Sequence, residues 1–196
     1  LSLLAPDLSK QFGWTNSDYA NITSVFQFVY AISMLFAGRF IDKLGTKIGY
    51  SLSVVVWSTA AMFHAIARSV FGFSIARVFL GLGEAGHFPA AVKTVAEWFP
   101  RKERAFATGL FNSGANIGAI IAPLTVPFIA AAYGWQWAFI ATGLLGFIWL
   151  FFWNKHYYKP SEHPKLSPAE LAYINSDADA IAESIIHPPK IVSEPS

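Results

Sequence analysis

The sequence contains no cysteine and little charge for its length of 196 residues. Without cysteine, disulfides and cysteine-ligated metal sites are excluded. Charged residues make up 13% of the chain, whereas a typical soluble domain carries about 25%. The formal net charge of +2 is too small to indicate nucleic-acid binding. The chain therefore lacks the polar groups that would cover a surface in water, and its composition indicates a membrane protein.

Three long stretches lack Asp, Glu, Lys and Arg altogether, namely residues 19–38, 48–67 and 105–154. A bilayer core roughly 30 Å thick is crossed by about 20 apolar residues in a helix. The first two stretches therefore predict one span each, and the third is long enough for two spans and a turn. Soluble helices of this length would carry a polar face, which these stretches lack.

We expect an all-α transmembrane domain over residues 1–158 and a soluble tail over residues 159–196. The chain starts with Leu1 in the middle of an apolar pattern, so we expect the first helix to begin before it. The expected elements are the end of that helix at 1–5, a loop at 6–17, spans at about 19–40, 48–67 and 71–92 with a charged connection at 38–47, and two spans within 105–154 that divide at the aromatic turn 133–137.

The basic residues are distributed unequally between the two sides of the predicted membrane domain. When the loops are numbered alternately, eleven of the fourteen Lys and Arg residues fall on the side that holds Asp42 and the tail. The opposite side holds only Lys10 and Arg68, and Arg77 lies within a span. The excess of Lys and Arg in cytoplasmic loops predicts that the Asp42 side and the tail are cytoplasmic.

The fourth expected span carries Arg77, Glu84 and His87. An isolated carboxylate in hydrocarbon costs several kcal/mol, so Glu84 must face a cavity or a partner, or be protonated. Arg77 lies two helical turns earlier, so both side chains lie on roughly the same face. This arrangement suits an anionic substrate that arrives with a proton. The alternative interpretation is an ion pair that locks helices together.

The two histidines in the expected spans receive different interpretations. His87 follows Glu84 by three residues and could share its proton, although a lone histidine in a helix is commonly hydrogen-bonded to a carbonyl group. His64, near the end of the third span, is expected to be structural. Neither the spacing of the pair nor a third ligand supports a metal site, and we expect no cofactor.

Three amides lie within otherwise apolar spans. Gln27 lies in the second span, and Asn112 and Asn116 lie one turn apart in the fifth, so the two asparagines face one side. These side chains could bind substrate hydroxyl groups or could join helices by hydrogen bonds. Both interpretations stay open.

A helix start is predicted in the tail. Ser167 at the cap, Pro168 at the first helical position and Glu170 three residues after the cap form a typical start signal. Apolar Leu171, Ile174 and Ile181 follow. We expect either a short surface helix on the cytoplasmic face or a solvated linker to a second half.

Several motifs resemble those of one transporter family. The run from Gly38 through Asp42, Lys43 and Gly45 to Lys47 resembles the loop signature of the major facilitator superfamily. The segment 77–89, with its arginine, glutamate and three glycines, is similar to the fourth helix of the anion:cation symporter branch. Segments 101–105, 134–139 and 160–173 also fit this branch, and the whole chain looks most like its bacterial hexuronate transporters, which take up galacturonate and glucuronate.

The resemblance implies the N-terminal six-helix half of a twelve-helix symporter in the inner membrane, which takes up a sugar-acid anion with a proton by alternating access. It implies proton coupling by Glu84, and Arg77 matches the family's arginine on the same helix, which we expect to bind substrate. From their positions in the spans, His87 is the candidate to share the proton, and Gln27, Asn112 and Asn116 are the further candidates for substrate binding. A cytoplasmic gate is implied at Gly38, Asp42, Lys43, Gly45 and Arg104, with Asp42 paired to basic groups such as Arg104. The second half of the protein, the proton and the lipid bilayer are the other implied partners.

Three other functions are compatible with a chain of this composition. Another organic anion or inorganic phosphate could replace the hexuronate, because a few side chains of a pocket decide substrate choice. An intramembrane enzyme is disfavoured because Ser113 lies in no Gly-x-Ser-x-Gly elbow. A receptor or scaffold that transports nothing would fail to alternate between inward-facing and outward-facing states.

Overall fold

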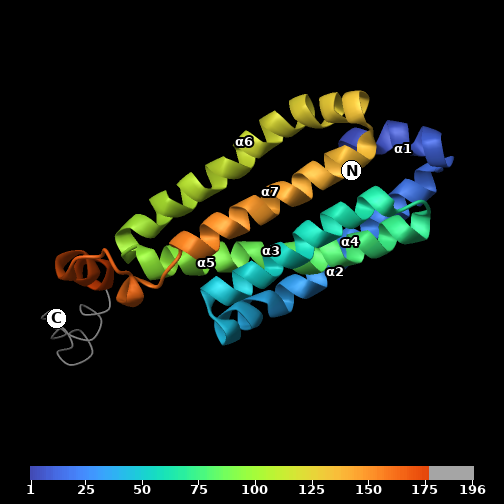
Figure 1. Ribbon diagram of the computed structural model, residues 1–196. Coiled ribbons are helices and arrows are strands. Elements are labelled where there is room, and N and C mark those ends of the chain that lie inside the picture. The colour runs from blue at the N-terminus through green and yellow to red at the C-terminus, as the bar shows by residue number, and fades with distance from the viewer. Residues whose placement is uncertain (177–196) are drawn as a thin grey trace, which may run out of the picture.

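The computed structural model describes residues 1–176, and all the regular structure in this part of the chain is helical. Figure 1 shows the long helices running side by side as an elongated bundle, with α1 at one end and the tail at the other. The helices are α1 (Ala5–Phe12), α2 (Asn16–Leu44), α3 (Thr46–Phe63), α4 (Val70–Glu84), α5 (His87–Trp98), α6 (Arg101–Tyr133) and α7 (Trp135–His156), with short 3-10 turns at Ser2–Leu4, His64–Ile66 and Pro160–Glu162 and a last helix over 168–176.

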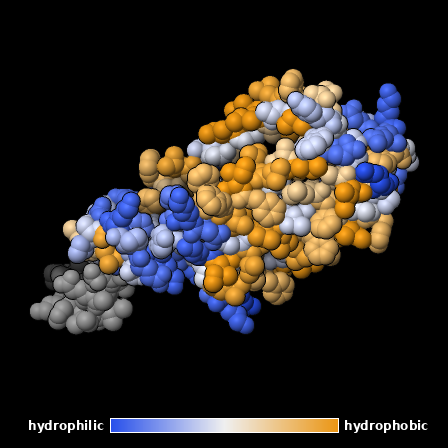
Figure 2. Space-filling model, viewed as in Figure 1, coloured by the Kyte–Doolittle hydropathy of each residue, from blue (hydrophilic) through white to orange (hydrophobic). Residues whose placement is uncertain are grey.

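Four helices are long and apolar enough to cross a membrane: α2, α3 with its 3-10 extension to Ile66, α6 and α7. They coincide with the second, third, fifth and sixth spans that the charge-free stretches predict. On the face that Figure 2 shows, apolar residues cover the middle of the bundle and hydrophilic residues gather at both ends. This distribution is what a bilayer requires, because only the ends of the helices meet water.

The predicted loop at 6–17 is wrong over most of its length, because residues 5–12 form α1. Pro6 stands at the start of this helix, Asp7 lies in the first turn and Lys10 in the last. These placements favour a helix. Proline lacks the N–H that would have no partner in a first helical turn, and an acidic residue at the start and a basic residue at the end of a helix interact favourably with the helix dipole. Gly13 ends the helix with a positive φ of 66°. The proline and glycine that suggested a loop are instead the ends of a short helix.

The predicted charged connection at 38–47 is also wrong, because α2 continues to Leu44 and α3 begins at Thr46. Only Gly45 separates them, with a φ of 79° that favours glycine. The charged residues at the end of α2 therefore stay helical, on a part of the helix that extends past its apolar window.

The fourth span, predicted as continuous from Phe71 to Val92, is interrupted. α4 ends at Glu84, two turn residues follow, and α5 begins at His87. The break leaves backbone bonds from Ala85 to Gly81 and from Gly86 to Gly83. Three glycines, Gly81, Gly83 and Gly86, lie at this break, and glycine lowers the cost of leaving helical geometry.

α4 lies close to two neighbours because glycine faces each of them. A Cβ on Gly83 would lie 2.5 Å from the backbone nitrogen of Trp57 in α3, and a Cβ on Gly81 would lie 3.0 Å from the carbonyl oxygen of Phe26 in α2. Backbone-to-backbone packing of this kind is typical of membrane helices with small residues at the contact. The close approach holds the Arg77–Glu84 segment against α2 and α3.

The tail confirms the predicted helix start. Ser167 Oγ accepts from the Glu170 backbone N–H at 3.2 Å, and the Glu170 carboxylate accepts from the Ser167 N–H at 2.9 Å. This reciprocal pair is a capping box at the start of the helix over 168–176. The predicted continuation through Ile181, like the rest of 177–196, lies outside the described residues.

Candidate functional site

A cavity of about 440 Å³ lies between α3, α4 and α7. It brings together Arg77, Glu84 and His87, the three ionisable residues predicted on the fourth span. The other lining residues are Leu1, Trp57, Ala61, His64, Leu80, Phe139 and Thr142. The shared face of Arg77 and Glu84 that their spacing predicts is thus present, and it faces a cavity.

Arg77 is half-buried in this cavity and holds few fixed partners. Its guanidinium carbon lies 5.3 Å from the centre of the Phe26 ring in α2. Its Nε is buried without a hydrogen-bond partner among residues 1–176. A buried guanidinium that keeps a donor unpaired favours an incoming anion, because the anion supplies the missing acceptor.

Glu84 is the last residue of α4 and keeps exposed surface beside the helix break. Within the described part of the chain, no ion pair joins Glu84 to Arg77. The two residues therefore share a cavity without forming the ion pair of the alternative interpretation. A carboxylate that has no fixed cation partner can gain and lose a proton without breaking a packing contact.

His87, at the start of α5, is surrounded by aromatic rings. Its ring centre lies 5.4 Å from Trp57, 5.5 Å from Phe111 and 5.7 Å from Tyr50. Its Nδ1 is buried and has no partner among residues 1–176. The ring is thus held by packing while one nitrogen is left without a hydrogen bond, and His87 lies on the wall of the same cavity as Glu84.

His64 also lines this cavity, which its sequence position did not indicate. The side chain is 0% exposed, its Nδ1 lies 2.8 Å from the carbonyl oxygen of Ala60, and its ring stacks on Phe139 at 4.9 Å. Because a carbonyl oxygen only accepts, Nδ1 carries the proton in this contact. The structural role expected for His64 is consistent with these contacts, but its proximity to Arg77 depends on helix packing and has no signal in the sequence.

The three predicted amides do not line this cavity. Gln27 is exposed on α2, and Asn112 and Asn116 are exposed on α6. The two asparagines lie on α6, and no residue of its apolar segment is buried within the described part of the chain. Their role in substrate binding stays a prediction. The hydroxyl that the cavity does contain belongs to Thr142, which donates to the Ala138 carbonyl at 3.0 Å.

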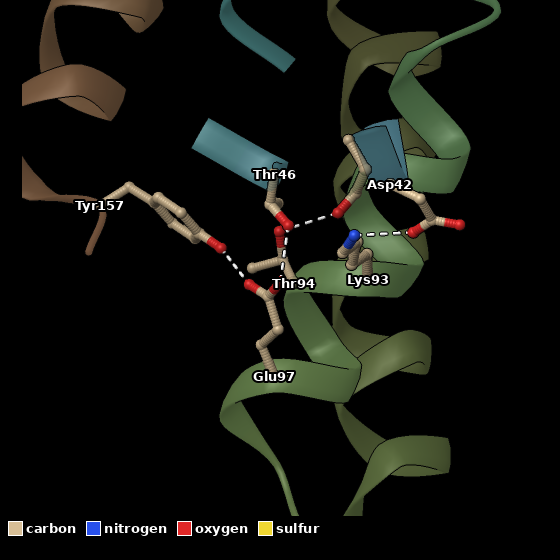
Figure 3. A network of polar contacts seen from close by, with 7 residues as sticks. Asp42, Thr46, Lys93, Thr94, Glu97 and Tyr157 are labelled. Carbon is tan, nitrogen blue, oxygen red and sulfur yellow. Dashed lines mark hydrogen bonds and ion pairs between the residues drawn. The ribbon is translucent and has the colours of Figure 1, made fainter. Parts of the chain in front are cut away.

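The predicted gate residues lie at the tail end of the bundle, where Asp42 forms an ion pair with Lys93 at 2.6 Å (Figure 3). The predicted pairing of Asp42 with Arg104 is wrong within the described part of the chain. Arg104 instead donates to the carbonyl oxygens of Phe99 at 3.0 Å and Ala96 at 2.9 Å. Its guanidinium therefore holds the end of α5, and the cation that reaches Asp42 comes from inside α5.

The remaining gate residues, Gly38, Lys43 and Gly45, lie along the end of α2 and its junction with α3. A Cβ on Gly38 would meet nothing within 4 Å, so packing within the described chain does not require glycine there. Lys43 is exposed. The ion pair between Asp42 and Lys93 is partly exposed, and pairs of this kind contribute about 0–1 kcal/mol to stability.

A second polar network near this gate was not predicted. Figure 3 shows Thr46 and Tyr157 both pointing toward the Glu97 carboxylate at the end of α5. Thr46 Oγ1 donates to Glu97 Oε1 at 2.7 Å, and the Tyr157 hydroxyl donates to Glu97 Oε2. Burial, followed by the hydrogen bond to Glu97, raises the pKa of Tyr157 above its ordinary value. Glu97 thus connects the start of α3, the end of α5 and the residue that follows α7.

The described residues contain no group of three His, Asp or Glu side chains that could hold a metal ion. The functional groups in the central cavity are the guanidinium of Arg77, the titratable carboxyl group of Glu84, the imidazoles of His64 and His87, and the hydroxyl of Thr142. These groups suit the binding of an anion and of a proton.

Comparison with known proteins gives a consistent result. A sequence model of the Major Facilitator Superfamily matches residues 1–191. The chain is 37% identical over 180 residues to a galacturonate transporter of Dickeya chrysanthemi, which covers 92% of this chain and 52% of that protein. It is 38% identical over 176 residues to a hexuronate transporter of Escherichia coli K12, which covers 90% of this chain and 41% of that protein. The chain spans about half the length of these curated relatives.

A similar fold occurs among solved structures. A bacterial homologue of the human lysosomal transporter Spinster, in an inward-facing and unoccupied conformation, superposes with a TM-score of 0.67 at 21% identity. The alignment covers 94% of this chain and 44% of that protein. At this identity the similarity shows the shared fold alone.

Proposed function

The chain belongs to the Major Facilitator Superfamily, and from that premise we propose that the protein of which it is part is a proton-coupled symporter of hexuronate anions in the inner membrane. The observation that carries the proposal is the cavity in which Arg77 and Glu84 lie without an ion pair between them. The identity of 37–38% to galacturonate and hexuronate transporters supports the choice of substrate class.

The two residues perform complementary tasks in this proposal. Arg77 favours the carboxylate of the substrate, because a fixed guanidinium in a half-buried cavity replaces the water that an anion loses. Glu84 binds the proton that travels with the anion. Moving one charge against a membrane potential costs about 2.3 kcal/mol per 100 mV. Transport of a monovalent anion together with one proton avoids this cost, since the pair is neutral.

His87 and the amides have supporting roles in the proposal. His87 shares the proton with Glu84, because it lines the same cavity and keeps Nδ1 without a partner. Gln27, Asn112 and Asn116 bind substrate hydroxyl groups from the exposed faces of α2 and α6. Those faces would meet the second half of a complete transporter, where a central substrate site is shared between halves.

The gate lies at the other end of α2. The ion pair of Asp42 with Lys93 joins α2 to α5, and we assign it, with Gly38, Lys43, Gly45 and Arg104, to the closing of the cytoplasmic side. The side that holds these residues and the tail is cytoplasmic in this proposal, because it carries most of the basic residues.

Uptake by the full-length protein in proteoliposomes tests the proposal. Labelled glucuronate is expected to accumulate when the pH gradient is inward and to equilibrate without it. Glu84→Gln is expected to abolish accumulation driven by the gradient while exchange of internal for external substrate continues, because the amide keeps the size of the side chain but carries no proton. Full proton-driven accumulation by Glu84→Gln would overturn the assignment.

Competition distinguishes the neighbouring substrate classes. A D-galactonate transporter of Escherichia coli is 33% identical to the chain over 175 residues, so galactonate is the principal alternative to a hexuronate, and phosphate is the inorganic one. An excess of the true substrate should suppress uptake of labelled glucuronate. If galactonate or phosphate suppressed the uptake of labelled glucuronate and unlabelled galacturonate did not, the suppressing anion would replace hexuronate as the proposed substrate.

A further inference from the structure

A second hollow lies at the tail end of the bundle, away from the Arg77 cavity. It is a groove of about 890 Å³ between α5, α7 and the helix over 168–176. The tail helix presents one face to it, with Ala169, Glu170, Tyr173 and Ile174 at helical spacing, and Leu166 just before the helix also lines it. Trp149, Phe152 and Trp153 of α7 form the opposite wall. We call this hollow the tail groove.

The tail groove is apolar and open. Trp149 remains 50% exposed and Phe152 48% exposed, although both line it. The described residues therefore leave a large aromatic surface without a partner, and large exposed apolar surfaces mark binding sites for apolar ligands or membranes. Figure 2 shows mostly hydrophilic residues over this end of the molecule, and the tail helix contributes Ala169, Tyr173 and Ile174 to the groove.

The groove continues the surface by which α7 meets the bilayer. α7 is one of the helices able to cross a membrane, and Leu145, Ile148 and Phe151 on it are all more than half exposed. Trp149 and Phe152 extend this exposed surface to the groove. Tryptophan and tyrosine at the end of a span lie at the level of the lipid headgroups. A hydrocarbon chain can thus pass from the side of α7 into the groove without crossing water.

The charges beside the groove favour an anionic headgroup. Residues 97–170 contain six Lys and Arg and four Glu. Three of these carboxylates already accept hydrogen bonds within the chain: Glu97 from Thr46 and Tyr157, Glu103 from Tyr173, and Glu170 from Ser167. Lys102 Nζ lies 4.7 Å from the centre of the Tyr173 ring, which lines the groove, and Lys155 lies in the last turn of α7.

We propose that the tail groove binds one anionic phospholipid, with an acyl chain against Trp149 and Phe152 and the phosphate beside Lys102 and Lys155. The tail helix forms the wall that separates this acyl chain from water. The site is independent of the transported solute, because it shares no lining residue with the Arg77 cavity.

Native mass spectrometry of the full-length protein, titrated in detergent with phosphatidylglycerol or with phosphatidylcholine of the same chains, tests the proposal. We expect one phosphatidylglycerol to be retained in preference to phosphatidylcholine. Ala169→Trp fills the groove and is expected to abolish this retention. Ala172→Trp is the matched control, because Ala172 is exposed on the same helix and does not line the groove.

The headgroup is tested by a substitution that leaves the groove open. Lys102→Gln is expected to weaken phosphatidylglycerol binding about fivefold, since each Lys near a lipid surface contributes about 1 kcal/mol. Lys10→Gln, which removes the same charge from the last turn of α1 at the opposite end of the bundle, is expected to leave phosphatidylglycerol binding unchanged.

Three results would overturn the proposal. Equal retention of both lipids would show that the site does not select an anionic headgroup, and unchanged retention in Ala169→Trp would show that the lipid binds outside the tail groove. Retention of neither lipid by the unmodified protein would show that the groove is not a phospholipid site and that a segment of protein covers it instead.

Discussion

The hydrogen bond from Tyr157 to Glu97 provides the sharpest test of the packing at the tail end of the bundle. Tyr157 is only 7% exposed, and its hydroxyl donates to one carboxylate oxygen while Thr46 donates to the other (Figure 3). In Tyr157→Phe the ring stays in place, and Glu97 Oε2 loses its donor. The substitution therefore removes the donor to the Glu97 carboxylate, together with the contacts of the hydroxyl with Thr46 and Thr94.

The expected loss follows from the charge of the acceptor. Hydrogen bonds to charged groups contribute about 1.5–3 kcal/mol, more than neutral ones. For a chain of 150–250 residues, each kcal/mol shifts the unfolding midpoint by about 2–4 °C. We therefore expect Tyr157→Phe to lower the midpoint by about 3–12 °C. Thr46 limits the loss, because Glu97 keeps that donor at 2.7 Å.

Tryptophan fluorescence during heating in detergent is the measurement. Trp153 stacks on the Tyr157 ring at 4.0 Å, so its emission reports the local structure. Tyr158→Phe is the matched control, because Tyr158 contacts Lys47 and His163 through its ring and Phe keeps that ring. Glu97→Gln combined with Tyr157→Phe should cost less than the sum of the two single changes.

Equal midpoints for Tyr157→Phe and Tyr158→Phe, or strict additivity with Glu97→Gln, would contradict a stabilising hydrogen bond between Tyr157 and Glu97. Equal midpoints would mean that the hydroxyl contributes nothing beyond its ring. Strict additivity would mean that the two groups do not interact in the folded protein.

Two further predictions use the same unfolding measurement. Gly83→Ala should destabilise the protein by about 1–3 kcal/mol, because the new Cβ would lie 2.5 Å from the Trp57 backbone. Gly109→Ala is the control, because a Cβ there would meet nothing within 4 Å. An equal loss of stability in the two variants would contradict close packing of α3 and α4. Burial and the Glu97 hydrogen bond raise the pKa of Tyr157, so the folded state holds the phenol proton more tightly than the unfolded state. That stability is complete below a pH of about 10 and is lost as the pH rises further. Between about pH 10 and 12 the unmodified protein should therefore lose more stability than Tyr157→Phe, and parallel curves would contradict this.

The break after Glu84 illustrates how far sequence reasoning reaches. The hydropathy of residues 71–92 predicts a span there, and the structure has helix on both sides of the break. The glycines of this segment were visible, but glycine is compatible with both a helix and a break. Close contacts of Gly81 with α2 and of Gly83 with α3 decide its course, and these contacts are invisible in a linear pattern.

The sequence by itself determined the properties that depend on neighbours along the chain. The positions of four spans follow from charge-free stretches, the tail helix start from Ser167 and Glu170, and the common face of Arg77 and Glu84 from their spacing, because each involves residues close together along the chain. Only the tertiary structure decided which helices meet. It placed His64 of the third span beside Arg77 and gave Asp42 to Lys93 in place of Arg104. Such contacts depend on the rotation and separation of packed helices, which no single segment encodes.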